Sequence, residues 1–298
     1  YVTGSTNSTA ATFVPLAWPG AYNQAVYGGG FDDAFILRFN AAGVKQWATY
    51  YGGTGQDQAY SILCDANDNI YAAGTTDGGF PTFAWGGAYN DPTFAGGVYP
   101  DIFILRFTNA GVLTWSTYYG GAGFEGYDTY DNIATDNCGN LYYSFLTDGG
   151  TSTFGSTTCG DYYDASFNGS LDAFVLKFDN AGVRVWATYF GGDGDEVRTP
   201  VAIDPTGKFY LAGEWVNAFN GGTYPLTFFA GSYNDATFNG PLDDAFISKF
   251  IPLAPTVTTS QTACTACNGT ATVTSGSGCA SISSYLYTWS NGQTTATA

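Results

Sequence analysis

The sequence predicts an all-β fold made of four related units, and three observations support this. A largely apolar motif that opens with Asp occurs four times, at residues 33–39, 101–107, 172–178 and 244–250. Gly, Thr, Tyr and Phe are abundant, which is typical of strands and tight turns. No stretch shows the sustained 3.6-residue apolar period of a helix.

Each of the first three copies continues with a Gly, a Trp and an aromatic-Gly-Gly sequence. The Trp always lies 14 residues after the Asp, at Trp47, Trp115 and Trp186. The copies begin 68, 71 and 72 residues apart. A repeat of this length indicates stacked or radial units, none of which can bury its apolar face alone. The regular tryptophans therefore predict packing between units.

We expect four antiparallel strands in each unit, which is the blade of a β-propeller. In the second unit they are expected at residues 59–65, 70–76, 101–107 and around Trp115. The small-residue strand 59–65 is placed beside a central channel and the Trp strand at the outer rim. Turns rich in Gly, Asn and Asp separate the strands, as hairpins require.

This phasing predicts two whole blades and two partial ones. Residues 59–119 and 127–190 form whole blades, residues 1–51 lack the innermost strand, and residues 197–250 lack the outermost strand. A propeller ring has typically about four to eight blades. We therefore expect residues upstream of Tyr1 to supply the missing outer strand.

Composition and charge exclude several classes of function. The chain has 25 acidic and 8 basic residues and a net charge of −17, which disfavours binding to nucleic acid or to anionic lipid. It has no His, so a Ser-His-Asp triad and imidazole metal ligands are excluded. No apolar run approaches the roughly 18 residues of a transmembrane helix.

One end of the predicted blades could bind a ligand. The loop after each Trp strand carries an acid, and we take Asp57, Glu125 and Asp195 as equivalent. The long connection between the second and third strands repeats a Tyr followed by Asn or Asp, at Tyr89, Asn90, Tyr163, Asp164, Tyr233 and Asn234. Oxygen ligands suit calcium, and aromatic rings suit sugars. The alternative is that each acid caps backbone N–H groups of its own Gly-rich turn and keeps the blades in register.

Other carboxylates favour structural explanations. Residues 65–69 resemble a calcium loop but lack the Gly and Glu such a loop needs, so an Asx turn is the better interpretation. Paired acids open two copies of the Asp motif and single acids open the others, which favours capping of the strand start over catalysis. These acids are Asp32, Asp33, Asp101, Asp172, Asp243 and Asp244. Glu214 is an acid at a position where the other copies of the repeat have no acid.

Six cysteines fall into separate groups. Cys138 and Cys159 flank one strand and loop of a single blade and could bridge. Two of the three cysteines near the end of the chain could pair, and we favour a disulfide over a metal site there. These are Cys264, Cys267 and Cys279. We expect Cys64 to be a buried free thiol in a strand.

Residues 1–250 resemble the SBBP family of bacterial β-propeller repeats. The shared motifs are Asp-Ala-Phe, Gly, Trp, Tyr-Gly-Gly-x-Gly-x-Asp, Asp-x-x-Gly-Asn-x-Tyr-x-x-Gly-x-Thr and Phe-Pro, in this order. The chain departs from the pattern at residues 141–145, where the family's Gly is absent, and in its longer loops. The resemblance implies an extracellular propeller and no particular activity.

Residues 251–262 are rich in Pro, Thr and Ser and predict an extended linker. Residues 263–298 then resemble the first part of an SprB-type repeat, through Cys-Asn-Gly, a Thr/Val strand and Tyr-x-Trp-Ser-Asn-Gly. This resemblance implies a partial Ig-like β-sandwich module. It also implies a surface adhesin of gliding bacteria, exported by type IX secretion.

These observations predict a non-enzymatic structural or adhesive protein of the bacterial cell surface. Its expected partners are other domains of a longer chain, surface glycans, copies of itself and the secretion machinery. The alternatives are a glycan-binding module and a carboxylate-dependent enzyme acting on polysaccharide, both using the loop end of the propeller. Calcium is the one cofactor that the sequence suggests.

Overall fold

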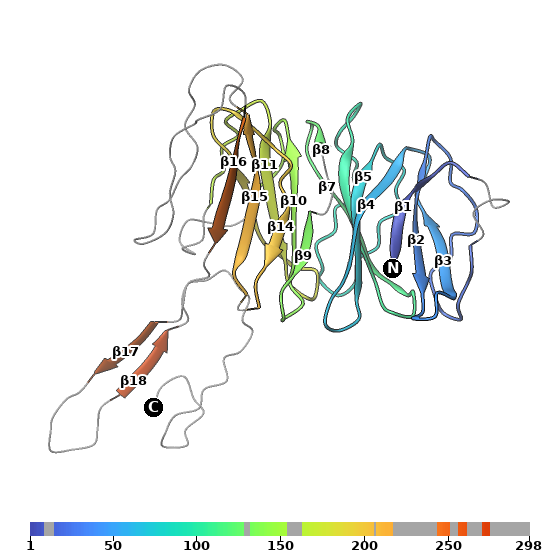
Figure 1. Ribbon diagram of the computed structural model, residues 1–298, viewed down its shortest axis with the longest axis horizontal. Helices are drawn as coiled ribbons and strands as arrows, with labels where there is room; N and C mark the ends of the chain where they lie inside the picture. Colours follow the sequence, from blue (N-terminus) through green and yellow to red (C-terminus); the bar gives the residue numbers. More distant parts are fainter. Residues whose placement is uncertain are drawn as a thin grey trace.

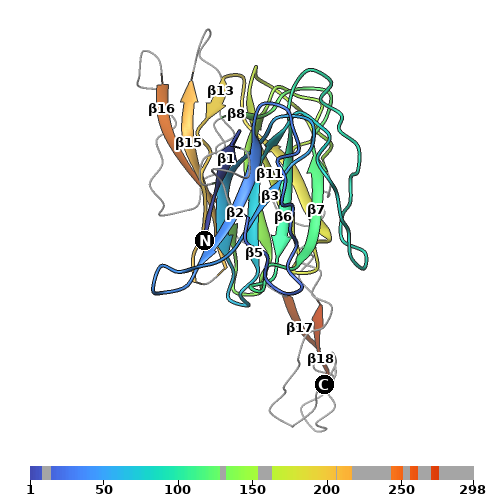
Figure 2. The ribbon, with the colours of Figure 1, turned by 90° about the vertical axis from the view of Figure 1, so that its right-hand side faces the viewer.

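The computed structural model describes residues 1–8, 15–127, 132–153, 163–205, 207–216, 243–250, 256–260 and 270–274. These residues form β-strands, turns and loops, with no helix among them. Figures 1 and 2 show four twisted sheets that stand side by side in chain order, with a separate two-stranded hairpin at one end. In the described part of the chain, therefore, no helix could span a membrane.

All strand pairs in the four sheets are antiparallel. The first sheet contains β1 (Val2–Thr6), β2 (Asp33–Phe39) and β3 (Lys45–Tyr51). The second contains β4 (Asp57–Cys64), β5 (Ile70–Thr76), β6 (Asp101–Phe107) and β7 (Leu113–Tyr119). The third contains β8 (Glu125–Tyr127), β9 (Ile133–Thr135), β10 (Leu141–Thr147), β11 (Asp172–Phe178) and β12 (Arg184–Phe190). The fourth contains β13 (Asp195–Val197), β14 (Val201–Ile203), β15 (Phe209–Val216) and β16 (Asp243–Phe250).

The predicted order of strands within a blade is confirmed. The second sheet runs β4-β5-β6-β7, from the small-residue strand to the Trp strand. Among the described strands, the first sheet lacks an innermost strand and the fourth lacks an outermost one. In the fourth sheet the innermost position is shared by two short strands, β13 and β14. The break falls at Arg198, whose φ is +52°, and Pro200, which has no N–H to donate.

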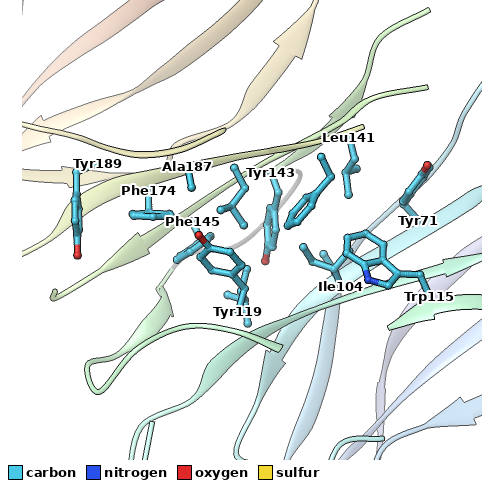
Figure 3. Packing of buried hydrophobic residues seen from close by; sticks show 14 residues of the cluster. Tyr71, Ile104, Trp115, Tyr119, Leu141, Tyr143, Phe145, Phe174, Ala187 and Tyr189 are labelled. Atoms are coloured by element: carbon cyan, nitrogen blue, oxygen red, sulfur yellow. The ribbon is translucent and has the colours of Figure 1, made fainter. Parts of the chain in front are cut away.

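The blades pack through alternate residues of the Asp-led strands. Ala34 and Ile36 of β2 lie in one apolar cluster with Phe103, Leu105 and Phe107 of β6. The next seam repeats this arrangement, as Figure 3 shows for Ile104, Trp115 and Tyr119 of the second blade against Tyr143, Phe145 and Phe174 of the third. At each seam the small and β-branched residues of one Asp-led strand, together with Trp and Tyr or Phe of the same blade, pack against the phenylalanines of the next Asp-led strand.

The predicted role of the regular tryptophans in packing between blades is confirmed. The ring of Trp47 lies 6.0 Å from Phe107, and the ring of Trp115 lies 4.9 Å from Phe178 of the following blade. The Trp47 indole N–H donates to the Asn109 carbonyl at 3.2 Å. Gly111 beside it has φ +81°, and an added Cβ would stand 3.1 Å from the Trp47 ring. A glycine is therefore required at this turn for both conformation and space.

In the first two blades, the long connection between the second and third strands covers the outer edge of the sheet. Leu16 exchanges backbone hydrogen bonds of 2.9 and 3.0 Å with Ala48 of β3, and Phe83 does so with Ser116 of β7 at 3.0 and 2.7 Å. The connection then reaches the following blade, where the Tyr89 N–H donates to the Gly182 carbonyl at 2.8 Å. Its length is thus explained by its course, and the outermost strand presents no free edge there.

The two ends of the stack leave apolar faces uncovered. Ile36, Ile104 and Val175 occupy equivalent positions and are 0% exposed, whereas Ile247 in the fourth blade is 74% exposed. At the other end, Phe39 is 40% exposed, while its equivalents in the next two blades are fully buried. The two open faces are of the two kinds that meet at every internal seam.

The remaining described strands are β17 (Thr256–Ser260) and β18 (Thr270–Thr274), which pair antiparallel. Strand β17 lies within residues 251–262, which we predicted to be a linker. Its Thr and Val residues are β-branched, which favours a strand over an unpaired linker. The boundaries of the predicted Ig-like module stay a prediction, and Cys264, Cys267 and Cys279 lie outside the described residues.

The seam packing gives a prediction with a built-in control. We expect Ile104→Ala to lower the free energy of unfolding by about 2–5 kcal/mol, because the side chain is fully buried between blades. The equivalent change Ile247→Ala should alter it by no more than about 0.5 kcal/mol, because that side chain faces solvent. Urea unfolding followed by tryptophan fluorescence measures both. Equal losses in the two variants would contradict this account of the seams.

Candidate functional site

Two acidic side chains meet at the loop end of each described seam, and we call each such set a carboxylate pair. The pairs are Asp33 with Asp57, Asp101 with Glu125, and Asp172 with Glu196. All six side chains are buried, with exposed fractions of 0–1%. The first acid of each pair opens an Asp-led strand, and the second opens or lies in the first part of the innermost strand of the next blade.

Each pair closes around the first glycine of the aromatic-Gly-Gly sequence. A Cβ added to Gly120 would stand 2.6 Å from Asp101 Oδ1 and 2.9 Å from Glu125 Oε2. A Cβ added to Gly52 would stand 2.7 Å from Asp57 Oδ2 and 3.0 Å from Asp33 Oδ1. A side chain at either glycine would therefore displace the pair.

The first acid of each pair holds the long connection. Asp33 Oδ2 accepts a hydrogen bond from the Gly28 N–H at 2.6 Å, and Asp101 Oδ2 accepts one from the Ala95 N–H at 2.9 Å. Asp172 accepts hydrogen bonds from two successive N–H groups of the corresponding segment, at 3.0 and 3.1 Å. The predicted capping role of these strand-opening acids is confirmed.

The second acid of each pair holds its own Gly-rich turn. Asp57 accepts from the Gly53 N–H at 2.7 Å, and Glu196 accepts from the Gly192 N–H at 3.2 Å. Glu125 is bonded to the backbone of Gly121 in the same way, and it also accepts from the hydroxyls of Thr151 and Thr147, outside its turn, at 2.7 and 3.1 Å. The structure thus shows the alternative that the sequence left open, in which the acids cap turns and set the register of the blades.

Of the three acids that we predicted to be equivalent, Asp195 is wrong by one residue. Glu196, and not Asp195, occupies the position of Asp57 and Glu125. Each of these three acids lies six residues after the aromatic residue of the aromatic-Gly-Gly sequence, and counting from that residue would have found it. Asp195 is half-buried and instead accepts the N–H groups of Ser170 and Leu171, at 3.1 and 3.2 Å.

Tyr89, which we predicted to lie on one face with the acids, lies at the other end of the blade. Tyr89 binds the turn that follows the end of β11, whereas the carboxylate pairs lie at the starts of the Asp-led strands. Its ring packs 5.4 Å from Tyr119 and 5.9 Å from Phe178, and the Arg184 guanidinium lies 4.7 Å above it. Tyr89 therefore belongs to the seam between blades, and the predicted single face of acids and aromatics is not formed by the described residues.

The other residues of the predicted long-connection set take mixed positions. Asn90 is exposed, while Tyr163 is half-buried and its hydroxyl lies 3.1 Å from the Thr153 hydroxyl. The Asp164 N–H donates to the Thr188 hydroxyl at 2.8 Å, as the Asp91 N–H donates to Thr117 at 2.9 Å. Asp164 thus aligns with Asp91, one residue later than the sequence suggested. Tyr233 and Asn234 lie outside the described residues.

Burial of paired acids raises their affinity for protons. Loss of hydration is the main cause, and it raises the pKa of Asp33, Asp57, Asp101 and Asp172 to about 6. The pKa of Glu125 rises to about 7 and that of Glu196 to about 9. In both cases loss of hydration is the main cause, and the negative charge of the first acid of the pair raises the pKa further. Buried oxygens without a hydrogen-bond partner remain on Asp33, Asp57, Asp101, Glu125 and Glu196.

The described residues contain no cluster of three or more side chains that would suit a calcium ion. In the described part of the chain, no three Asp, Glu, Cys or His side chains gather in a way that could hold a metal ion. The turn at Asp65 is an Asx turn as expected, because Asp65 Oδ1 accepts the N–H groups of Asn67 and Asn69 at 2.8 and 2.9 Å. Calcium binding at the loop end stays a prediction.

The remaining candidate residues are placed as follows. Glu214 forms an ion pair with Arg198. Cys64 is free but exposed, so its predicted burial is wrong; it lies at the end of β4, the innermost strand of its blade, where the sheet ends. Cys138 is also exposed, and its predicted partner Cys159 lies outside the described residues.

Comparisons with known proteins agree with this architecture. The family model of SBBP, a beta-propeller repeat, matches residues 46–81, which run from the Trp strand of one blade through β5 of the next. An alignment of 181 residues, 56% of this chain, is 23% identical to an uncharacterized WD repeat-containing protein of Acanthamoeba polyphaga mimivirus. The chain covers 12% of that protein. This is a beta-propeller repeat protein, and its all-β blades are consistent with a β-propeller.

The carboxylate pairs predict a stability that falls as the pH rises. Their pKa values lie near 4 in the unfolded chain and near 6–7 or higher in the folded protein, so the folded protein binds more protons within this window. The contribution of these groups to the free energy of unfolding is therefore greatest below pH 4 to 5 and declines toward pH 8. Thermal melts at constant ionic strength should show a higher Tm at pH 5 than at pH 8.

A matched pair of variants separates this effect from general repulsion in an acidic chain. Glu125→Gln removes one buried acid and should reduce the difference in Tm between pH 5 and pH 8. Asp243→Asn removes one exposed acid and should leave that difference nearly unchanged. If both variants reduced it equally, the carboxylate pairs would not be its source.

Proposed function

We propose that this chain is the propeller part of a non-enzymatic, secreted protein of the bacterial cell surface. Its role is structural or adhesive: the propeller is a rigid body that spaces and presents modules of a longer protein. The observation that carries this proposal is the equivalence of the three carboxylate pairs. The same loop-holding bonds recur in three blades, whereas an enzyme built on repeats places distinct acids in one blade.

The burial of the pairs supports this role over a carboxylate-dependent hydrolase. Hydrolysis of a glycosidic bond needs two carboxyl groups that flank the substrate, one to donate a proton and one to attack or activate water. The paired acids are enclosed and bind the backbone of their own loops. Glu214, the acid that departs from the repeat, is already engaged by Arg198.

The open faces at the two ends of the stack support the proposed partners. Each seam inside the molecule packs the isoleucine or valine of one Asp-led strand against the phenylalanines of the next, and at the two ends Ile247 and Phe39 lack this packing. Further repeats of the same protein, or a second copy of this chain, would bury Ile247 and Phe39 in the same way. The extracellular location and type IX export rest on the family resemblances.

Calcium remains a proposed ligand of the loop end, because a cation would neutralise a carboxylate pair as a proton does. Chelation with EDTA at pH 8 measures this directly. A lower Tm after chelation supports the site, and an unchanged Tm removes it.

Surface location is the first prediction of the proposed function. Proteinase K added to intact cells of the native host should degrade the protein while a cytoplasmic marker stays whole. Purified protein should also release no reducing ends from a panel of polysaccharides. Protection of the protein until the cells are lysed would contradict the surface role. Hydrolysis that is lost in Glu214→Gln would favour the enzyme instead.

A further inference from the structure

Two exposed tryptophans occupy equivalent places in neighbouring blades. Trp18 is 45% exposed and Trp85 is 74% exposed, whereas the packing tryptophans Trp47 and Trp115 are 1% and 2% exposed. Each of the two begins a tight turn of the long connection, closed by the Ala21 N–H to the Trp18 carbonyl at 2.9 Å and by the equivalent bond to Trp85 at 3.0 Å. The fold holds the turns without burying these indoles.

Both turns are fixed on either side. Two residues before each Trp, the chain pairs with the outer strand of its own blade, through Leu16 in one case and Phe83 in the other. Four residues after each Trp, a tyrosine N–H binds the hairpin turn of the next blade, at Gly111 or Gly182. The indoles are therefore presented from a rigid backbone, which lowers the entropy lost when a ligand binds.

The segment that carries each indole has no charged residue. The segments 18–23 and 85–90 contain no Asp, Glu, Lys or Arg, and each ends in an exposed asparagine, Asn23 or Asn90. The hairpin turns that they contact carry a further exposed valine, at Val112 and Val183. We call the set of Trp18, Asn23, Trp85 and Asn90 the rim row.

We propose that the rim row binds a neutral polysaccharide. Indole faces stack on the C–H faces of sugar rings, and the amides can hydrogen-bond hydroxyl groups beside them. The site recurs at the spacing of the blades, which suits a polymer of repeating units. A polyanionic glycan would be repelled by the net charge of −17.

The rim row is less suited to binding a peptide. Peptides that bind a sheet usually add a strand to its free edge. Here Leu16 and Phe83 already occupy the outer edges of β3 and β7. The rim row therefore offers side chains and not backbone groups, as a glycan site does.

This inference deepens the proposed adhesive function by naming a class of ligand. Native affinity electrophoresis of the full chain in gels with xyloglucan, laminarin or galactomannan tests it. Alginate serves as the anionic probe and phosphatidylcholine vesicles as an apolar one. We expect at least one neutral polysaccharide to retard the protein, and Trp18→Ala/Trp85→Ala to weaken this binding at least about tenfold with an unchanged Tm.

Phe31→Ala is the matched control, because Phe31 is 71% exposed at the end of the long connection next to the carboxylate pairs. It should bind as the unchanged protein does. Lack of retardation by all three neutral polysaccharides would overturn the inference, as would full affinity in the double variant. Vesicle or alginate binding that depends on Trp18 and Trp85 would also overturn it. None of these outcomes decides surface location, which the protease experiment tests separately.

Discussion

The close approach of two buried acids to one glycine is the constraint on which the rest of the structure depends. Asp101 and Glu125 can meet around Gly120 because no Cβ stands between them. The other oxygen of Asp101 accepts the Ala95 N–H of the long connection, and the other oxygen of Glu125 accepts the Thr151 hydroxyl of the third blade. Three segments distant in sequence are thus fixed at one point. Since the same point recurs at each seam, the blades repeat in register.

At the first two seams, the opposite end of the blades is held by different chemistry. There the tryptophan ring, the tyrosine of the long connection and the left-handed glycine of the next hairpin meet, as at Trp47, Tyr22 and Gly111. With both ends fixed by residues of the repeat, the acids are committed to structure. The exposed part of the long connection is left free to vary, and this is where the rim row lies.

Much of the fold could be predicted because local patterns determine it. Strand order, the capping by Asp33 and the packing of Trp47 follow from alternation, turn residues and the repeat. The course of the long connection could not be predicted, since its pairing with an outer strand is not encoded by a local pattern. For that reason the sequence predicts the wrong end of the blade for Tyr89. Glu196 is different, because it lies six residues after Phe190 as Asp57 and Glu125 do after their aromatic residues, and the repeat alone therefore determines its position.

The central claim is that the carboxylate pairs are enclosed structural groups that share protons. Carbon-13 NMR titration of the Glu125 side-chain carboxyl, in protein labelled at glutamate, tests it most directly. The account predicts a pKa of about 7, well above the ordinary 4.5. A pKa near 4.5 would show a solvated carboxylate and would contradict the account.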